Sequence, residues 1–142
     1  MNLSNVAITT DGDSSTYPHE EFPVLFDTGS TVSYLPNEMV EALAEDLGAE
    51  VDEKLQVHVA PCDQEGTLHF TFGNYTIDVA LNDFVWKLPS GKCLMGAAAD
   101  DSDDPIYTLG ASFLRSVYSK LCLFFPLACY LAVHAWLTLR AP

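Results

Sequence analysis

Residues 22–36 read Phe-Pro-Val-Leu-Phe-Asp-Thr-Gly-Ser-Thr-Val-Ser-Tyr-Leu-Pro. The first five residues form a short apolar run, which ends where the turn-forming residues 27–30 begin. An apolar run bounded by turn residues is typical of a buried strand. We therefore predict a buried strand over 22–26 that enters a tight loop, and we expect any chemistry in that loop.

The loop carries groups that acid–base chemistry uses. Asp27 supplies a carboxylate, Thr28 and Ser30 supply hydroxyls, and Gly29 lets other backbone approach closely. Hydrolysis of a peptide by carboxylates requires two of them, one to take a proton from water and one to polarise the carbonyl. The 142 residues contain no second Asp-Thr-Gly or Asp-Ser-Gly. A single triplet could occur in any surface turn, so the loop alone is a weak indication of function.

The sequence after the loop predicts one helix followed by strands. Apolar residues recur at helical spacing after Pro36, and Gly48 can end that helix in a left-handed conformation. From Leu55 onward apolar and polar residues alternate, which is typical of half-buried strands. Gly73-Asn74 predicts a two-residue hairpin, since both residues tolerate positive φ. Further short strands are expected at 84–86, 93–95 and 107–109, so the predicted class is all-β with one or two short helices.

Composition limits the function classes. The chain has 142 residues, 49% of them hydrophobic, which suits one domain. Asp and Glu number 20 against 6 Lys and Arg, so nucleic acid is not an expected partner. The acidic stretch 100–104 matches no complete calcium motif and is expected to be a solvated loop. His58 and His69 lack a Cys or carboxylate partner at metal-ligand spacing, and all four histidines are expected to be surface or satisfied residues, so we predict no metal site and no cofactor.

The four cysteines divide between the acidic part and the apolar tail. Cys62 and Cys93 lie in the acidic part, whereas Cys122 and Cys129 lie in the tail. From spacing alone, Cys62 and Cys93 form either a disulfide or two buried thiols. The triplets that begin at Asn2 and Asn74 fit the N-glycosylation pattern, which matters only in the secretory lumen. Residues 1–10 predict no secretory signal peptide, because they contain no basic start and no long apolar run.

Two segments resemble the C-terminal lobe of pepsin-like aspartic proteases. Residues 22–36 look like the apolar strand, active-site loop and helix entry of that lobe. Residues 107–118, Tyr-Thr-Leu-Gly-Ala-Ser-Phe-Leu-Arg-Ser-Val-Tyr, are similar to its apolar-apolar-glycine segment and following short helix. The resemblance covers roughly 4–118 and is closest to fungal secreted or cell-surface members. It implies one lobe of a bilobal enzyme, a Cys62–Cys93 disulfide, and a secretory location outside the cell, at its surface or in a vacuole.

The resemblance also assigns roles within the loop. Asp27 would be the catalytic aspartate of this lobe. The hydroxyl of Thr28 would reach the loop of the neighbouring lobe. Gly29 would present its N–H to the carboxylate, and Ser30 would bond its outer oxygen.

The remaining roles concern the support of the loop and the activity of the chain. Gly110 would pass beneath the loop with Leu109 packed against it, and Thr31 would line the primed side of the substrate cleft. The implied activity is aspartic endopeptidase action on polypeptides. With one aspartate the chain would be a half-enzyme that needs a second copy or a separate first lobe. The alternative is an inert lobe, a pseudoenzyme or truncated product that acts at most as a binding module.

The tail departs from the family pattern. We expect residues 1–118 to form the lobe without its last strands, and residues 119–142 to form an apolar tail that can be helical. Residues 121–139 contain no Asp, Glu, Lys or Arg and are long enough for a membrane span, although Pro126 and His134 weaken that interpretation. The alternatives are translated noncoding or shifted sequence, and segments that replace missing edge strands. Thr108 also stands where an apolar residue is usual.

Overall fold

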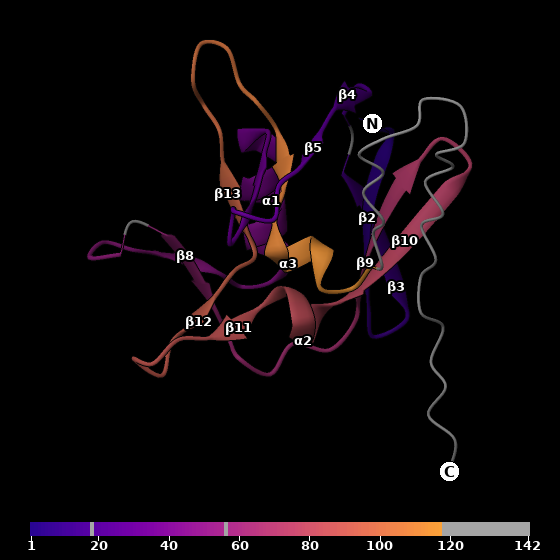
Figure 1. Ribbon diagram of the computed structural model, residues 1–142. Coiled ribbons are helices and arrows are strands. Elements are labelled where there is room, and N and C mark those ends of the chain that lie inside the picture. Colours follow the sequence, from indigo (N-terminus) through magenta and orange to yellow (C-terminus); the bar gives the residue numbers. More distant parts are fainter. Residues whose placement is uncertain (18, 56, 118–142) are drawn as a thin grey trace.

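The computed structural model describes residues 1–17, 19–55 and 57–117, and β-strands dominate them (Figure 1). The helices are α1 (Asn37–Asp46), α2 (Leu81–Phe84) and α3 (Ala111–Leu114). The strands are β1 (Asn2–Leu3), β2 (Asn5–Thr10), β3 (Asp13–Tyr17), β4 (Phe22–Pro23), β5 (Leu25–Phe26), β6 (Ser33–Leu35), β7 (Glu50–Asp52), β8 (Val57–Ala60), β9 (Thr67–Phe72), β10 (Tyr75–Ala80), β11 (Trp86–Lys87), β12 (Cys93–Leu94), β13 (Ala97–Ala99) and β14 (Thr108–Leu109). The predicted mostly-β class is confirmed, with a ten-residue helix and two four-residue helices among these residues.

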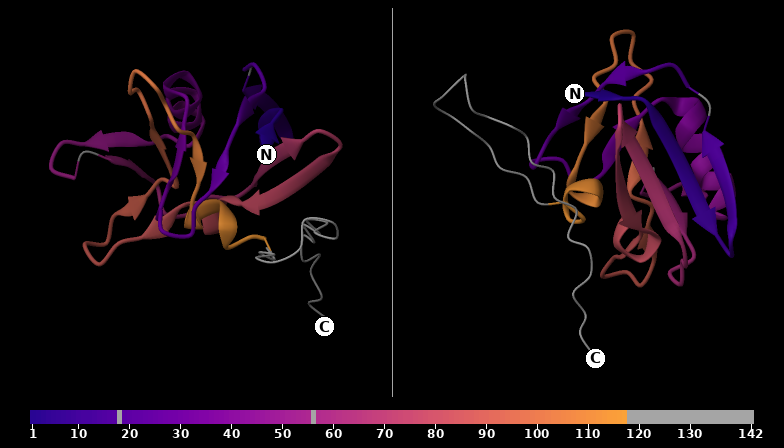
Figure 2. Two further views of the ribbon diagram at one scale, coloured as in Figure 1. Left: turned by 45° about the horizontal axis from the view of Figure 1, so that its top comes forward. Right: turned by 90° about the vertical axis from the view of Figure 1, so that its right-hand side faces the viewer.

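The strands form three four-stranded sheets and one two-stranded pair, β1-β4. The four-stranded sheets have the orders β10-β9-β2-β3, β11-β12-β8-β7 and β13-β6-β14-β5. In the third sheet β13 is parallel to β6 and β14 is parallel to β5, whereas β14 is antiparallel to β6. Figure 2 shows the β2-β3-β9-β10 and β7-β8-β11-β12 sheets on opposite sides of this central group. The central sheet therefore brings together segments that are far apart in the sequence.

Helix α1 matches its sequence pattern. Met39, Val40, Leu43 and Ala44 point into the core. Gly48 has φ +59°, and the N–H groups of Gly48 and Ala49 donate to the carbonyls of Glu45 and Ala44. This arrangement is the Schellman ending that a glycine after a helix favours. The predicted helix and its glycine end are confirmed.

Two hairpins build the β10-β9-β2-β3 sheet. Gly73 and Asn74 join β9 to β10 as predicted, but only Gly73 has positive φ, +60°. This pattern fits a type II′ turn, in which glycine takes the first central position. Asp11 and Gly12, with φ +51° and +88°, join β2 to β3, and the prediction missed this second hairpin. Asp-Gly is a strong hairpin signal, so the sequence did contain the information.

An aromatic cluster fills the core between the sheets. Phe113 of α3 is fully buried, and its ring lies 5.1 Å from that of Phe70 and 6.1 Å from that of Phe72. Phe26, next to the Asp27 loop, lies 5.9 Å from Phe113 in a stacked arrangement. The helix that follows Gly110 is therefore held against β5 and β9 by ring packing.

The β11-β12-β8-β7 sheet carries a covalent and an ionic link. Cys62 and Cys93 form a disulfide with an S–S distance of 2.05 Å, so the predicted pairing is confirmed. One residue earlier, Lys92 pairs with the buried carboxylate of Asp52. The backbone N–H groups of Lys54 and Leu55 donate to the other oxygen of Asp52. The disulfide joins the segment after β8 to the start of β12, and the ion pair joins the end of β7 to the turn before β12.

Three local predictions were wrong. The segment 22–26 is not one buried strand, because it splits into β4 and β5, and both side chains of β5 are exposed. The predicted strand at 84–86 is instead the end of α2 followed by β11, since Phe84 faces the core from a helical turn. Leu55 lies in a turn and not in a strand.

The predictions for the tail lie outside the described residues. They concern residues 119–142, including Cys122, Cys129 and the proposed span 121–139. Among residues 1–17, 19–55 and 57–117, no helix combines the length and the apolar character that a membrane crossing needs.

Candidate active site

Asp27 lies at the tip of the loop between β5 and β6, and both of its carboxylate oxygens accept hydrogen bonds. The N–H of Gly29 donates to Oδ1 at 2.8 Å, and Ser30 Oγ donates to Oδ2 at 2.7 Å. Asp27 itself is half-buried, whereas Thr28, Gly29 and Thr31 are exposed. The loop thus presents one oriented carboxylate at the surface, with Thr28 free to contact a neighbouring molecule.

The same two donors change the acidity of Asp27. The Ser30 hydroxyl, and after it the Gly29 N–H, stabilise the charged carboxylate and lower the pKa of Asp27 below its ordinary value. Partial burial acts in the opposite direction but is the smaller effect. In this lobe the charged form of Asp27 is therefore favoured more than in an ordinary aspartate.

Gly110 supports the loop from below. A Cβ atom at Gly110 would lie 2.2 Å from the carbonyl oxygen of Val32 and 2.7 Å from that of Ser30. The adjoining strand continues this contact, because the N–H of Asp27 donates to the Leu109 carbonyl at 3.1 Å. Only a residue without a side chain fits at this position. The contacts of Leu109 and Gly110 therefore fix the position of the Asp27 loop relative to β14 and α3.

Two buried serines beneath the loop were missed by the sequence analysis. Ser33 and Ser112 are fully buried, and their hydroxyl oxygens lie 2.9 Å apart. The N–H of Gly110 also donates to Ser33 Oγ, at 3.2 Å. Backbone bonds from Ala111 to the Ser30 carbonyl and from Ser112 to the Thr31 carbonyl complete the junction. A lone serine in an apolar stretch carries no sequence signal for such a role.

An apolar strip runs across the central sheet from the loop. Thr108 is the register partner of both Leu25 and Tyr34, so these three side chains share one face. Leu25 is 57% exposed and Tyr34 39%, and Ile106, which precedes β14, is 62% exposed. The strip was not predicted, because apolar residues in strands resemble core positions. Large exposed apolar side chains beside an oriented carboxylate suit the contact of an extended peptide or of a second protein surface.

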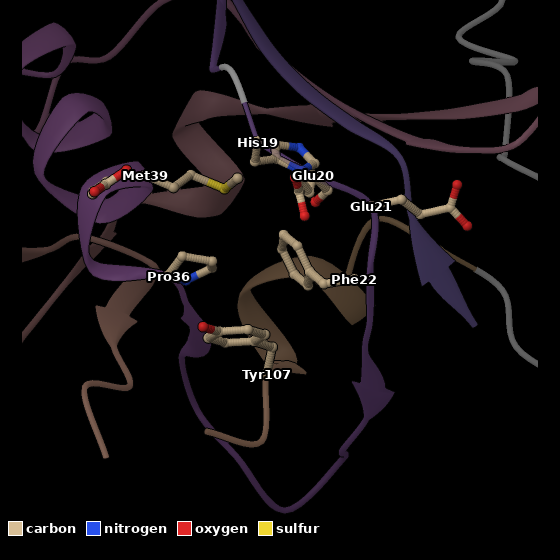
Figure 3. A pocket seen from close by; sticks show the side chains of 8 residues that line it. His19, Glu20, Glu21, Phe22, Pro36, Met39 and Tyr107 are labelled. Carbon is tan, nitrogen blue, oxygen red and sulfur yellow. Dashed lines mark hydrogen bonds between the residues drawn. The ribbon is translucent and has the colours of Figure 1, made fainter. Parts of the chain in front are cut away.

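A separate pocket of about 320 Å³ lies between β4, the start of α1 and the segment before β14. Figure 3 shows Phe22, Tyr107, His19 and Met39 turned toward it, while Glu21 points away. The rings of Phe22 and Tyr107 meet edge to face at 4.8 Å. No residue of the loop 27–31 lines this pocket, so it is distinct from the carboxylate site.

The acidic loop and His69 have local partners. Asp100 accepts hydrogen bonds from the Ser102 hydroxyl, the Ser102 N–H and the Ile106 N–H. These bonds lower the pKa of Asp100, and the Ser102 hydroxyl has the largest effect. His69 contacts Asp78 at 2.7 Å and Thr9 at 3.0 Å across the outer face of the sheet. Over the part of the chain that the structure describes, no three His, Cys, Asp or Glu residues are grouped as metal ligands.

Three relatives resemble most of the chain. Aspartic proteinase yapsin-3 of Saccharomyces cerevisiae is 31% identical over 121 residues, covering 83% of this chain and 24% of the relative. Aspartic proteinase 3 of the same yeast is 32% identical over 122 residues, covering 83% and 21%. Secreted aspartic protease 9 of Candida albicans is 30% identical over 99 residues, covering 67% and 18%. The chain therefore spans about a quarter or less of the length of these relatives.

The sequence model of one protein family matches residues 2–123, which include the Asp27 loop, Gly110 and the disulfide. The family is described as eukaryotic aspartyl protease, and its activity is aspartic-type endopeptidase hydrolysis of polypeptides. The mostly-β fold agrees with a single pepsin-like lobe. This chain belongs to the eukaryotic aspartyl protease family.

Proposed function

We propose that residues 1–118 form one catalytic lobe of an aspartic endopeptidase, with Asp27 as its catalytic carboxylate. The observation that carries this proposal is the position of Asp27 at the tip of a loop that backbone contacts fix from below. The exposed position of Thr28 and the bonds of Gly29 and Ser30 to the carboxylate support the roles proposed for these residues. The contacts of Leu109 and Gly110 with the loop support their proposed role beneath it. A carboxylate fixed in this way loses little freedom when it orients an attacking water.

One carboxylate cannot complete the reaction. Asp27 has a lowered pKa and is anionic in mild acid, so it can accept a proton from water but cannot supply one to the carbonyl. A second carboxylate close to Asp27 would share one proton with it, because two adjacent negative charges repel each other. We propose that a first lobe or a second copy of the chain supplies that carboxylate. A single copy of the chain without such a partner is an inactive half-enzyme.

The exposed face around the loop supports a role in contacting other chains. Thr28 lies at the surface beside Asp27, where it can donate to the backbone of a partner loop. The strip of Leu25, Tyr34, Thr108 and Ile106 leads away from the loop and offers apolar contact to substrate side chains. Thr31, exposed in the same loop, is the proposed contact on the primed side of the cleft. We propose that these residues form half of a substrate cleft.

We also propose that the chain works on the secretory route. A structural disulfide persists in oxidising compartments, and Cys62–Cys93 is such a bond. One relative is by its name a secreted protease.

The proposal is tested by supplying the second lobe. The full chain is mixed with the first lobe of yapsin-3, and cleavage of an acid-denatured protein is followed at about pH 4, where one proton of a carboxylate pair is retained. We expect cleavage that a pepstatin-type inhibitor blocks and that Asp27→Asn abolishes. The matched control is Asp100→Asn, which removes another carboxylate of lowered pKa outside the loop and should keep the activity.

Concentration separates the two sources of the second carboxylate. If a second copy supplies it, the chain alone cleaves with a rate that rises as the square of its concentration when dilute. Cleavage that survives Asp27→Asn would contradict the assignment of Asp27. Lobes that bind each other without cleaving would show that the chain is an inert lobe.

A further inference from the structure

We propose that Asn74 is an N-glycosylation acceptor and that Asn2, in the other matching triplet, is not. Both triplets carry a hydroxyl two residues after the asparagine, Ser4 in one and Thr76 in the other. The sequence pattern cannot distinguish them, but their positions in the fold can. The inference depends on entry into the secretory lumen and not on catalysis by Asp27.

Asn74 occupies the tip of the β9–β10 hairpin. It is the second residue of the two-residue turn, and Asn74, Tyr75 and Thr76 are all exposed. Tyr75 is 76% exposed, the highest value of any large apolar side chain in the described residues. Figures 1 and 2 show that the hairpin end extends to the margin of the molecule. A bulky glycan on Asn74 therefore has room in solvent without displacing a packed element.

The hydroxyl of Thr76 also stays near the surface. Its Oγ1 lies 3.0 Å from Thr71 Oγ1 on the outer face of the hairpin. This is an exposed side-chain contact, which is easily exchanged for water. The side chains of Asn74 and Thr76 are therefore both accessible to a transferase before the hairpin turn has formed or when it opens.

The Asn2 triplet is built into the sheets. Leu3, its middle residue, is fully buried. Ser4 Oγ donates to the Thr71 carbonyl at 3.0 Å and accepts from the Gly73 N–H at 3.1 Å. Asn2 itself is exposed, and its Nδ2 donates to Glu21 Oε1 at 2.8 Å in an exposed contact. The burial of Leu3 and the two bonds of Ser4 therefore exclude the Asn2 triplet from a transferase once β1 has paired with β4.

The reaction uses a lipid-linked oligosaccharide pyrophosphate as the donor. A bond forms between Asn74 Nδ2 and the anomeric carbon of the first sugar, and the nitrogen loses one proton. The bond from that carbon to the phosphate oxygen breaks, and the lipid pyrophosphate leaves with its electron pair. The product is an amide-linked glycan at the start of β10, an edge strand of its sheet. A glycan there also hinders pairing of this edge with another chain.

The test expresses the full chain in yeast behind a cleavable secretion leader. Loss of the leader identifies molecules that reached the lumen, and only these are scored, by gel mobility before and after peptide N-glycosidase. We expect one glycan on the wild-type chain and on Asn2→Gln, and none on Asn74→Gln or Thr76→Ala. After the enzyme treatment, mass spectrometry of the tryptic peptide 55–87 should show Asp in place of Asn74.

Matched variants separate the triplet from the hairpin contact. Thr71→Ala removes the hydroxyl partner of Thr76 but leaves the triplet intact, and Thr76→Ser keeps the acceptor pattern. Both should remain glycosylated. Leader-cleaved chain without a glycan at Asn74 would overturn the proposal. A glycan on Asn2 would equally refute it, because the contacts of Leu3 and Ser4 would then not exclude modification.

Discussion

Replacement of Gly110 by Ala tests the support of the Asp27 loop most directly. The added Cβ would lie 2.2 Å from the Val32 carbonyl oxygen, 2.7 Å from that of Ser30 and 2.8 Å from the Val32 carbonyl carbon. All three atoms are backbone, so no side chain can rotate away. Gly110 has φ −89° and ψ −162°, which alanine adopts without strain, so the effect is steric alone. The loop must move by about 1 Å to reach ordinary contact, and overpacking of this kind costs about 3 kcal/mol.

The assay is urea unfolding of the full chain with its disulfide intact, near neutral pH. The control is Gly48→Ala, where φ is +59° and no atom lies within 4 Å of the added Cβ. That variant pays only for the left-handed conformation, about 1 kcal/mol. We expect Gly110→Ala to be clearly less stable than Gly48→Ala. Because Ser30 moves with the loop, the pKa of Asp27 should also rise in Gly110→Ala. Equal stability of the two variants would refute the idea that Gly110 holds the loop.

Three further predictions concern acidity and crosslinking. Ser30→Ala should raise the pKa of Asp27 toward its ordinary value, measured by carboxyl-carbon NMR titration, since the hydroxyl bonds the charged form; an unchanged pKa would contradict this. Asp52→Asn should destabilise the fold near neutral pH more than in strong acid. The pKa of Asp52 is lowered by Lys92 and by the N–H groups of Leu55 and Lys54, so its contribution is present above its ordinary pKa and lost as pH falls through the folded value; equal effects in urea at both pH values would argue against it. Replacement of Cys62 and Cys93 by Ser should lower the unfolding free energy by about 3 to 4 kcal/mol for a separation of 31 residues, and denaturation without reductant checks this.

Local patterns predicted the parts of the fold that depend on neighbours in sequence. The spacing of Met39, Val40 and Leu43 predicted α1, because one helix face must be apolar to reach the core. Gly73-Asn74 predicted the hairpin, because glycine takes positive φ without a steric penalty. The Asp27 loop could also be identified from local sequence, because its carboxylate, hydroxyls and glycine lie within four consecutive residues.

Long-range packing decided what the sequence patterns could not. Leu25 looked like a core residue, but β5 is an edge strand of its sheet and its side chain faces outward. Ser33 and Ser112 are 79 residues apart and meet only when β6 passes α3. Phe84, the last residue of the helical turn Leu81–Phe84, was placed in a strand over 84–86, because a turn of four residues is too short to show a period. Exposure of an apolar strand residue depends on the partner strand, which local sequence does not contain.

A final prediction concerns the pH dependence of lobe association. In the free chain the Ser30 and Gly29 donors keep the pKa of Asp27 low, so Asp27 is anionic in mild acid. When a second carboxylate approaches, repulsion between the two anions raises the pKa of the pair, and the complex binds one proton more than the separate lobes. Between the low pKa of free Asp27 and the raised pKa of the pair, the dissociation constant should therefore rise tenfold per pH unit.

Calorimetric titration of the chain with a first lobe, in buffers of different ionisation enthalpy, measures this proton uptake directly. Asp27→Asn removes one of the two charges, so it should bind without proton uptake and with an affinity that hardly changes with pH. The same uptake in wild type and Asp27→Asn would mean that the two carboxylates do not meet. The donors around Asp27 stabilise its charged form, so they favour the separate lobes over the complex. Association must therefore gain free energy from the bound proton and from contacts of the exposed apolar strip.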